Sequence, residues 1–317
     1  MKLAGGGDLR FADADGNILA HEIDTWNTSG ESLVWVKVPT LTAATKITAY
    51  YGNDLPCPAS ADSVWDSGYV GVWHLGQSGL PLTESTGVTK PFSGLVGSVN
   101  YAASGIAGGA VDFPGTDVTT RLKASDDDDL DGFDSFTFEV WTKRNVQTGL
   151  NTVLSRRING NTKNNAYVWQ QWNDQNGICY FTIGSGSANT QIVKSTDVFP
   201  AMGVWAHSAV VRDTDNKAIR AYLDGVSYES GCDYCGDQIC NAATELWLGG
   251  MQGYSDDPSA NPNGSRPFIG LIDELRISRV ARSADWIKAT HDTIAEDAFA
   301  VCSSARENRN GLSIIIR

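Results

Sequence analysis

The stretch "FIGLIDELRISRVARSADWI", residues 268 to 287, decides the fold, because it begins as an apolar strand-like run and carries two adjacent carboxylates in its middle. Successive side chains of a β-strand point to opposite faces. On a regular strand Asp273 therefore shares the apolar face with Leu271 and Leu275, and Glu274 shares the other face with Arg276. The alternation predicts that the two carboxylates point to opposite sides of a sheet.

A carboxylate on an apolar face is costly unless it is paired, so Asp273 needs a cation or several N–H donors. Two interpretations stay open: Asp273 binds calcium, or it accepts hydrogen bonds from backbone amides. Glu274 lies two residues before Arg276 on its face, which predicts a surface ion pair. We interpret the stretch as a strand that completes the sandwich and stabilises it. The functional site is then expected on another surface.

The composition limits the possible partners. The chain has 317 residues and a formal net charge of −13, whereas nucleic acids and anionic membranes attract basic surfaces. No segment approaches the roughly 18 apolar residues of a membrane span, so we expect neither nucleic-acid binding nor membrane insertion. The start "MKLAGGGDLRF" lacks the apolar region of a secretory signal. We interpret the chain as part of a larger, multidomain extracellular or cell-envelope protein.

Cysteine usage is consistent with such a compartment. The six cysteines are Cys57, Cys179, Cys232, Cys235, Cys240 and Cys302. The C-x-x-C spacing within "GCDYCGDQIC" (231–240) also occurs in zinc and redox sites. No second C-x-x-C completes a zinc site, and disulfides in an oxidising environment are the favoured interpretation. The pairing cannot be read from the sequence.

The order of strands and turns predicts an all-β protein. Residues 1–56 read as a small β module, and the Pro-containing "DLPCPASADS" (54–63) reads as a boundary. Residues 64–297 form a second domain of short antiparallel strands, typical of a β-sandwich or jelly roll. In "SFTFEVWTKR" (135–144), Phe136, Phe138 and Val140 alternate with outward residues that include Trp141. Asp224-Gly225 predicts a hairpin.

Helical structure is expected in one place, "RSADWIKATHDT" (282–293), with Ser283 as the N-cap. Residues 298–317 form a C-terminal tail without an evident strand partner.

A set of segments in fixed order resembles a known family. The segments "GIAGGAVDFPGTD" (105–117), "SFTFEVWTKR", "RAYLDGVSYES" (220–230) and "FIGLIDELRISRVARSADWI" are similar to laminin-G-like, concanavalin A-like jelly-roll domains of bacterial surface and secreted proteins. The segments "DLRFADADG", "WVKVP" and "YYGN" near the N-terminus resemble a small domain of unknown function, DUF2341, that precedes such jelly rolls. The resemblance implies two antiparallel sheets, rim loops that contact glycans and a structural calcium. It assigns Asp273 as the side-chain ligand, with carbonyl donors at Gly115 and near Trp73 or His74.

Catalysis on such a sandwich needs a specific acidic pair. Glycosidases use two carboxylates about 5 Å or roughly 6.5–9.5 Å apart, and related β-glucanases carry them in a Glu-x-Asp-x-x-Glu motif. That motif does not occur here, and Glu139 and Glu245 are single acids on different strands. The sequence therefore favours a protein without catalytic residues, while a glycoside hydrolase or polysaccharide lyase is the alternative.

Aromatic residues suggest where a sugar could bind, because sugar rings stack their C–H faces on aromatic side chains. "NNAYVWQQWNDQNG" (164–177) places Tyr167 and Trp169 on one face and Trp172 on the other, and Trp141 and Tyr254 add to this set. The alternative for Trp169 and Trp172 is an ordinary place in the core. The sequence predicts a non-catalytic glycan-binding or adhesion module whose partner is a glycan or glycoconjugate, with an enzyme or a structural spacer as alternatives.

Overall fold

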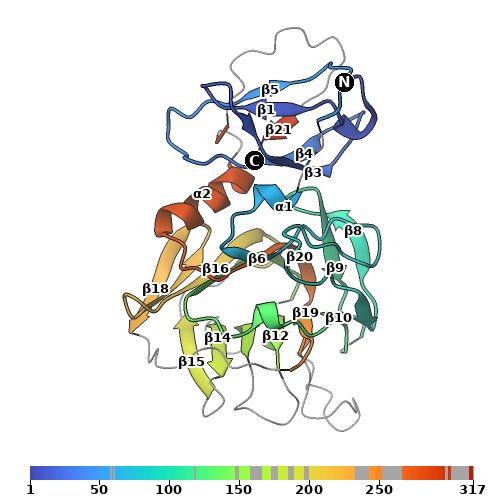
Figure 1. Cartoon of the computed structure of the whole chain (residues 1–317). Helices are drawn as coiled ribbons and strands as arrows, with labels where there is room; N and C mark the ends of the chain where they lie inside the picture. Colours follow the sequence, from blue (N-terminus) through green and yellow to red (C-terminus); the bar gives the residue numbers. More distant parts are fainter. Residues whose placement is uncertain are drawn as a thin grey trace. The chain divides into compact units, whose positions relative to one another are not determined.

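The computed structural model describes residues 1–57, 59, 61–117, 119–146, 150–157, 166–172, 178–184, 189–195, 200–232, 243–251, 266–296, 299–300 and 314–316. The chain forms two compact units (Figure 1). The first comprises residues 1–67 together with 293–317, and the second comprises residues 68–292.

The N-terminal unit holds two three-stranded sheets, ordered β2-β1-β5 and β21-β4-β3. The strands are β1 Arg10–Ala12, β2 Ile18–Leu19, β3 His21–Thr25, β4 Ser32–Val36, β5 Thr48–Tyr50 and β21 Ile314–Ile316, with the short helices η1 Ala4–Gly6 and α1 Ala61–Val64. Its core is formed by Leu9, Phe11, Leu19 and Val34. Strand β21 pairs in parallel with β4, so the tail does have a strand partner, contrary to the sequence-based expectation.

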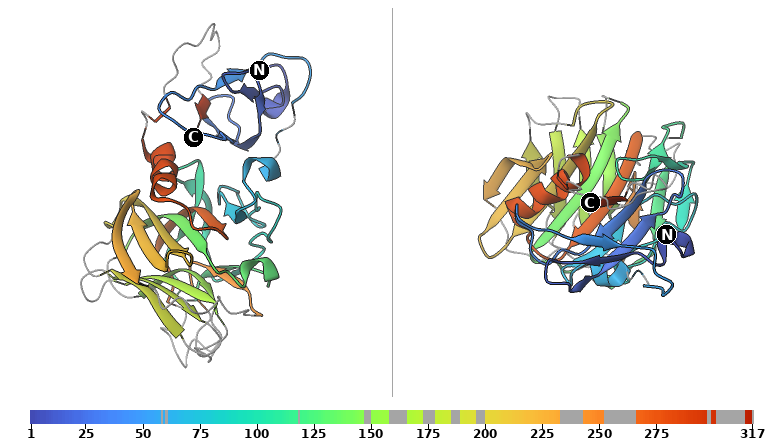
Figure 2. Two further views of the ribbon diagram at one scale, coloured as in Figure 1. Left: turned by 60° about the vertical axis from the view of Figure 1, so that its left-hand side comes forward. Right: turned by 90° about the horizontal axis from the view of Figure 1, so that it is seen from above.

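The C-terminal unit is a sandwich of two antiparallel sheets, seen edge-on in the left view of Figure 2. The seven-stranded sheet contains, in spatial order, β15 Asn189–Ser195, β14 Ile178–Gly184, β13 Tyr167–Trp172, β12 Leu150–Arg156, β19 Leu246–Leu248, β10 Arg121–Ala124 and β7 Gly94–Val96. The eight-stranded sheet contains β18 Val226–Cys232, β17 Ala218–Leu223, β16 Trp205–Asp213, β11 Phe136–Arg144, β20 Gly270–Ser278, β9 Gly109–Phe113 and β8 Asn100–Ser104, and β6 Tyr69–Trp73 also pairs with β20. This arrangement confirms the predicted all-β antiparallel sandwich.

One continuous apolar core fills the space between the two sheets. On β11 it takes Phe136, Phe138 and Val140, as the alternation of that segment predicts. Leu122 and Leu248 contribute to it from the seven-stranded sheet. The face of each sheet that points away from this core is called its outer face below.

The helix α2, Ala284–Ala295, begins where it was predicted, because the Ser283 hydroxyl accepts a hydrogen bond from the Trp286 amide at 3.2 Å. Ile287 of α2 is fully buried and packs against Ala209, Val211 and Tyr222 on the outer face of the eight-stranded sheet. This outer face is therefore a second packed layer, and a ligand has no access to the part that α2 covers.

An acidic segment supports one end of the core. The acidic sequence of residues 125–136 predicts a solvated turn, with a calcium-binding loop as the alternative. In the structure, Asp131 accepts hydrogen bonds from Nε and Nη2 of Arg156 at 3.1 and 2.7 Å, and Asp126 accepts one from Nη2 at 2.6 Å. Arg156 is completely buried, so these two carboxylates neutralise a core guanidinium.

Candidate functional site

The two adjacent carboxylates of β20 lie on the same side of the sheet, because a β-bulge interrupts the alternation. Against β11, Asp273 pairs with Trp141 and Arg276 pairs with Glu139, with a register shift between these pairs. Glu274 occupies the bulge at φ +49°. Asp273 and Arg276 consequently share the outer face, although they are three residues apart. The predicted opposite orientation of the carboxylates is wrong, since regular alternation cannot pass through a bulge.

Asp273 is fully buried and binds backbone amides. Its Oδ2 accepts hydrogen bonds from the amides of Ile106 at 2.9 Å and Ala107 at 3.1 Å. Gly105 allows this approach, because a Cβ at that position would lie 2.5 Å from Oδ2. Amide donors direct positive charge at this oxygen, as the amide interpretation expects.

The other two predicted calcium ligands are backbone carbonyls, at Gly115 and His74. Gly115 lies in a turn at φ +73°, where a Cβ would meet the side chain of Ile269 at 2.8 Å. His74 follows β6 and places Nδ1 2.7 Å from Oε1 of Glu274. Calcium at Asp273 stays a prediction.

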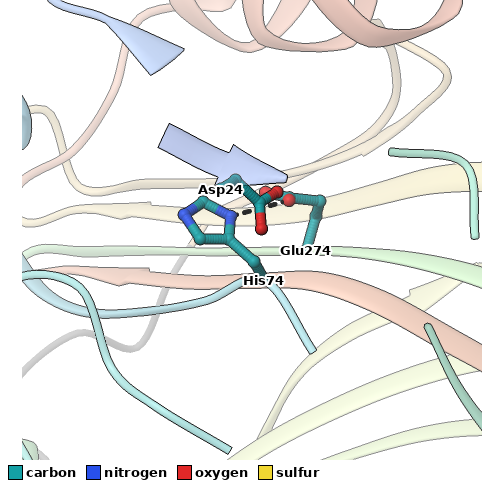
Figure 3. A group of neighbouring side chains, drawn as sticks. All are labelled: Asp24, His74 and Glu274. Carbon is teal, nitrogen blue, oxygen red and sulfur yellow. Dashed lines mark hydrogen bonds and ion pairs between the residues drawn. The ribbon is translucent and has the colours of Figure 1, made fainter. Parts of the chain in front are cut away.

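Glu274 forms the centre of a buried charged cluster with His74 and Arg276, and Figure 3 shows its pairing with His74. Its Oε2 accepts a hydrogen bond from Nη2 of Arg276 at 2.7 Å. Burial raises the pKa of Glu274, but the charges of His74 and Arg276 outweigh it and hold the pKa below its ordinary value of 4.5. Glu274 and Arg276 are 1% and 5% exposed, so the predicted surface ion pair is instead an internal one.

Three of the five predicted ligand-binding aromatic residues are covered by protein. Tyr167 and Trp169 are 0% and 1% exposed and lie in the core, with ring centroids 4.8 Å from Phe138 and 5.9 Å from Phe181, respectively. Their shared face was predicted correctly, but it is the face that points at the other sheet. This corrects the expectation that their rings are open to a ligand.

Trp141 is on an outer face, as predicted, and is nevertheless buried, with 3% exposure. Its ring stacks on His291 of α2 at 5.5 Å and contacts His207 at 5.2 Å. The helix therefore fills the position that a sugar would need. Trp172 ends β13 with a side chain outside the described set, and Tyr254 lies outside the described residues.

The cysteine predictions fall largely outside the described part of the chain. Cys57 is a free thiol. The side chains of Cys179 and Cys232, and residues Cys235, Cys240 and Cys302, are outside the described set.

The outer face of the seven-stranded sheet carries a tryptophan that the sequence analysis did not single out. Trp247 of β19 pairs with Lys123 of β10 on one side and Ser155 of β12 on the other. The guanidinium carbon of Arg121 lies 4.5 Å from the Trp247 ring centroid, and Nζ of Lys123 lies 5.6 Å from it. Lys123 also binds Glu245 at 2.9 Å. A signal existed in "TELWLGG", where Trp247 alternates with two core leucines.

Polar side chains continue across the neighbouring strands of the same face. Gln170 of β13 donates from Nε2 to the Thr152 hydroxyl at 3.0 Å and to the sulfur of Met251 at 3.3 Å. Nη1 of Arg157 also approaches this sulfur, at 3.8 Å. The hydroxyl of Ser155 donates to the Gly250 carbonyl at 2.9 Å.

One donor on this face has no protein acceptor. Nε1 of Trp247 is buried and has no hydrogen-bond partner in the described structure. A buried unpaired N–H costs about 1–3 kcal/mol, so an acceptor that reached it would be bound favourably. We define the Trp247 cluster as Trp247, Arg121, Lys123, Glu245, Ser155, Gln170 and Arg157.

Comparison with known proteins agrees with this architecture. A family model described as the concanavalin A-like lectin/glucanases superfamily matches residues 115–288, more than half of the chain, and a model of a domain of unknown function, DUF2341, matches residues 5–67. Both matches confirm the resemblance seen in the sequence. No curated protein matches the chain.

Two solved structures are similar to this chain. Domain 4 of AbnA, an extracellular GH43 arabinanase from Geobacillus stearothermophilus solved with arabinotriose, is 22% identical at a TM-score of 0.51, covering 69% of this chain and 96% of that one. The CBM40 of the Ruminococcus gnavus IT-sialidase, bound to α2,3-sialyllactose, is 16% identical at a TM-score of 0.42, covering 50% of this chain and 83% of its own.

Proposed function

The chain belongs to the concanavalin A-like lectin/glucanases superfamily, and we propose that it is a non-catalytic module that binds a glycan at the Trp247 cluster. The observation that carries the proposal is the aromatic and polar character of this outer face, with the buried and unpaired Nε1 of Trp247 at its centre. Binding sites for small molecules combine aromatic surface with a few placed polar groups. The cluster has this composition.

The chemistry of the cluster suits a sugar. Hydroxyl groups of a glycan both donate and accept hydrogen bonds, and the face carries the unpaired Trp247 N–H beside Gln170 and Ser155, whose side chains bond Thr152, Met251 and Gly250. An acceptor oxygen at Nε1 would satisfy a donor that the protein leaves unpaired. The carbohydrate-bound domain of the arabinanase has the same fold, which supports this choice among functions of the superfamily.

A carbohydrate-active enzyme is the second candidate, because the superfamily includes glucanases. Glycoside hydrolysis needs two suitably spaced carboxylates. Among the residues of the Trp247 cluster, Glu245 is acidic and is already paired with Lys123. Glu139 is buried on the other sheet. The arrangement favours binding over hydrolysis.

The setting that we propose is an extracellular or cell-envelope protein of which this chain forms a part. Within the described residues, the helices are too short or too polar to span a membrane. Extracellular glycans are then the accessible partners.

A glycan array probed with the full chain tests the proposal. We expect the wild type to bind a defined set of glycans. The affinity of Trp247→Phe, which keeps an aromatic ring and loses the N–H, should be at least about tenfold lower. Trp286→Ala is the matched control, since Trp286 is 39% exposed on α2. Equal binding by wild type and Trp247→Phe would show that the glycan does not bind at the Trp247 cluster. Release of shortened products from a bound polysaccharide would show that the protein is an enzyme.

A further inference from the structure

An exposed ion pair lies beside the unpaired N–H of Trp247. Nζ of Lys123 lies 2.9 Å from Oε1 of Glu245, and the two side chains are 38% and 37% exposed. The same ammonium lies 5.6 Å from the Trp247 ring centroid. The pair is therefore an accessible polar part of the Trp247 cluster, next to a donor that the protein leaves unsatisfied.

Both members of the pair keep hydrogen-bonding capacity. A lysine ammonium has three donors, and an ionised carboxylate accepts at both oxygens. Among the described residues, Lys123 uses one donor on Oε1 of Glu245, and Oε2 of Glu245 accepts no hydrogen bond. One ligand hydroxyl can accept from this ammonium while the next donates to this carboxylate. Adjacent hydroxyls of a sugar ring suit the pair, because each of them both donates and accepts.

The surrounding charges disfavour a charged ligand. An anion at Lys123 would lie beside the carboxylate of Glu245, and a cation at Glu245 would lie beside the ammonium, and like charges in contact are costly. Arg121 also interacts with a carboxylate, that of Asp117. The net charge of −13 repels anions at long range. A neutral ligand meets none of these costs.

The ring of Trp247 limits how a ligand approaches. The guanidinium carbon of Arg121 and Nζ of Lys123 both lie over this ring, where they occupy positions that a stacked sugar would need. The indole edge carries Nε1, which is a donor only. A ligand oxygen at that edge satisfies the N–H and stays within reach of the neighbouring ion pair.

We propose that the Lys123–Glu245 pair sets the specificity of the Trp247 cluster, and that the ligand is a neutral sugar whose adjacent hydroxyls bind both members of the pair. One hydroxyl accepts from Nζ of Lys123, and its neighbour donates to Oε2 of Glu245. This inference rests on the proposed function, since it names the ligand class and two specificity-determining residues at the same cluster.

Titration calorimetry of the full chain tests the inference with matched probes. These are galactan, mannan and glucan oligosaccharides of equal length, each compared with a counterpart in which C6 is oxidised to a carboxylate. We expect at least one neutral probe to bind about tenfold or more tightly than its anionic counterpart. Because no ligand charge is involved, sodium chloride should change the affinity for the neutral probe little.

Variants test the role of the ion pair. Glu245→Gln leaves Lys123 without its anion, so it should weaken binding of the neutral probe at least about fivefold and narrow its advantage over the anionic counterpart. Lys123→Met should also weaken binding of the neutral probe. Asp129→Asn, in the exposed pair of Asp129 with Arg279, is the matched control and should bind like the wild type.

The outcomes separate this inference from the proposed function. Binding that Trp247→Phe weakens and neither pair variant changes would overturn the inference and leave the proposed function intact. The same holds if the anionic counterparts bind as tightly as the neutral probes. Failure of every glycan on the array to bind a correctly folded chain would overturn both.

Discussion

At the scale of single residues, the backbone of Glu274 decides how two acidic side chains are used. A positive φ is uncommon outside glycine and costs of order 1–3 kcal/mol. The surrounding contacts offset this cost: Glu274 binds His74 and Arg276, and its neighbour Asp273 reaches the amides of Ile106 and Ala107. Both carboxylates serve the fold in these contacts, so neither is available as half of a catalytic pair.

Glu274→Gln tests the buried cluster. Because the folded-state pKa of Glu274 lies below 4.5, its carboxylate stabilises the fold fully above pH ~4.5, and this contribution is lost as the pH falls through the lowered pKa. Removing one partner of a buried pair costs about 3–5 kcal/mol. Chemical denaturation between pH 3 and 7 should show the variant less stable at neutral pH and approaching the wild type at low pH. A difference in unfolding free energy between variant and wild type that stays constant across this pH range would contradict a charged Glu274 in the buried cluster.

Asp273→Asn distinguishes the two interpretations of Asp273. Loss of the charged acceptor of two amides is expected to lower the free energy of unfolding by about 1–3 kcal/mol, with or without calcium. Thermal melts of both proteins in calcium and in chelator measure this. A chelator-dependent fall in the wild-type Tm that is absent from the variant would instead establish a calcium ion at this carboxylate.

At the scale of elements, regular strands, turns and helix ends could be predicted from the sequence, and irregular backbone could not. The core face of β11, the N-cap of α2 and the Asp224-Gly225 turn, at φ +49° and +75°, were predicted from local sequence and are confirmed. Alternation shows which side chains share a face of a strand, but not which face points to the core. Tyr167 and Trp169 were therefore correctly placed on one face, and that face was wrongly assigned to the surface. Alternation also cannot reveal a β-bulge, and for this reason the orientation of Asp273 relative to Glu274 was predicted wrongly.

The Trp247 cluster was missed for a related reason. Its members lie on or directly beside β10, β12, β13 and β19, and their proximity depends on a strand order in which β19 lies between β10 and β12. Sequence patterns describe each strand separately. Only the pairing of strands distant along the chain brings Arg121, Trp247 and Ser155 side by side.

At the scale of the whole molecule, the two units have separate cores, and the first is assembled from both ends of the sequence. Residues 314–316 pair with residues 32–34 through the β21–β4 ladder. A parallel neighbour satisfies backbone groups along one edge of β4. The C-terminal segment is thus a structural part of the N-terminal unit.

A chain ending at residue 300 tests this pairing. Loss of a few ladder hydrogen bonds, worth about 0.5–1.5 kcal/mol each, should speed amide hydrogen exchange in β4 and leave the β11–β16 ladder protected. Ile315→Pro removes one backbone donor in the full chain and should act in the same direction. Unchanged exchange in β4 for both variants would contradict the pairing.

The pairing of β21 with β4 also has a consequence during synthesis. The ribosome makes β4 before the C-terminal unit and β21 after it, so at 5–20 residues per second the edge of β4 waits on the order of tens of seconds for its partner. An open strand edge can template pairing with other chains. The N-terminal unit is therefore completed only after the sandwich between its two parts has been made, and the nascent protein passes through a period in which a chaperone or a neighbouring copy can occupy that edge.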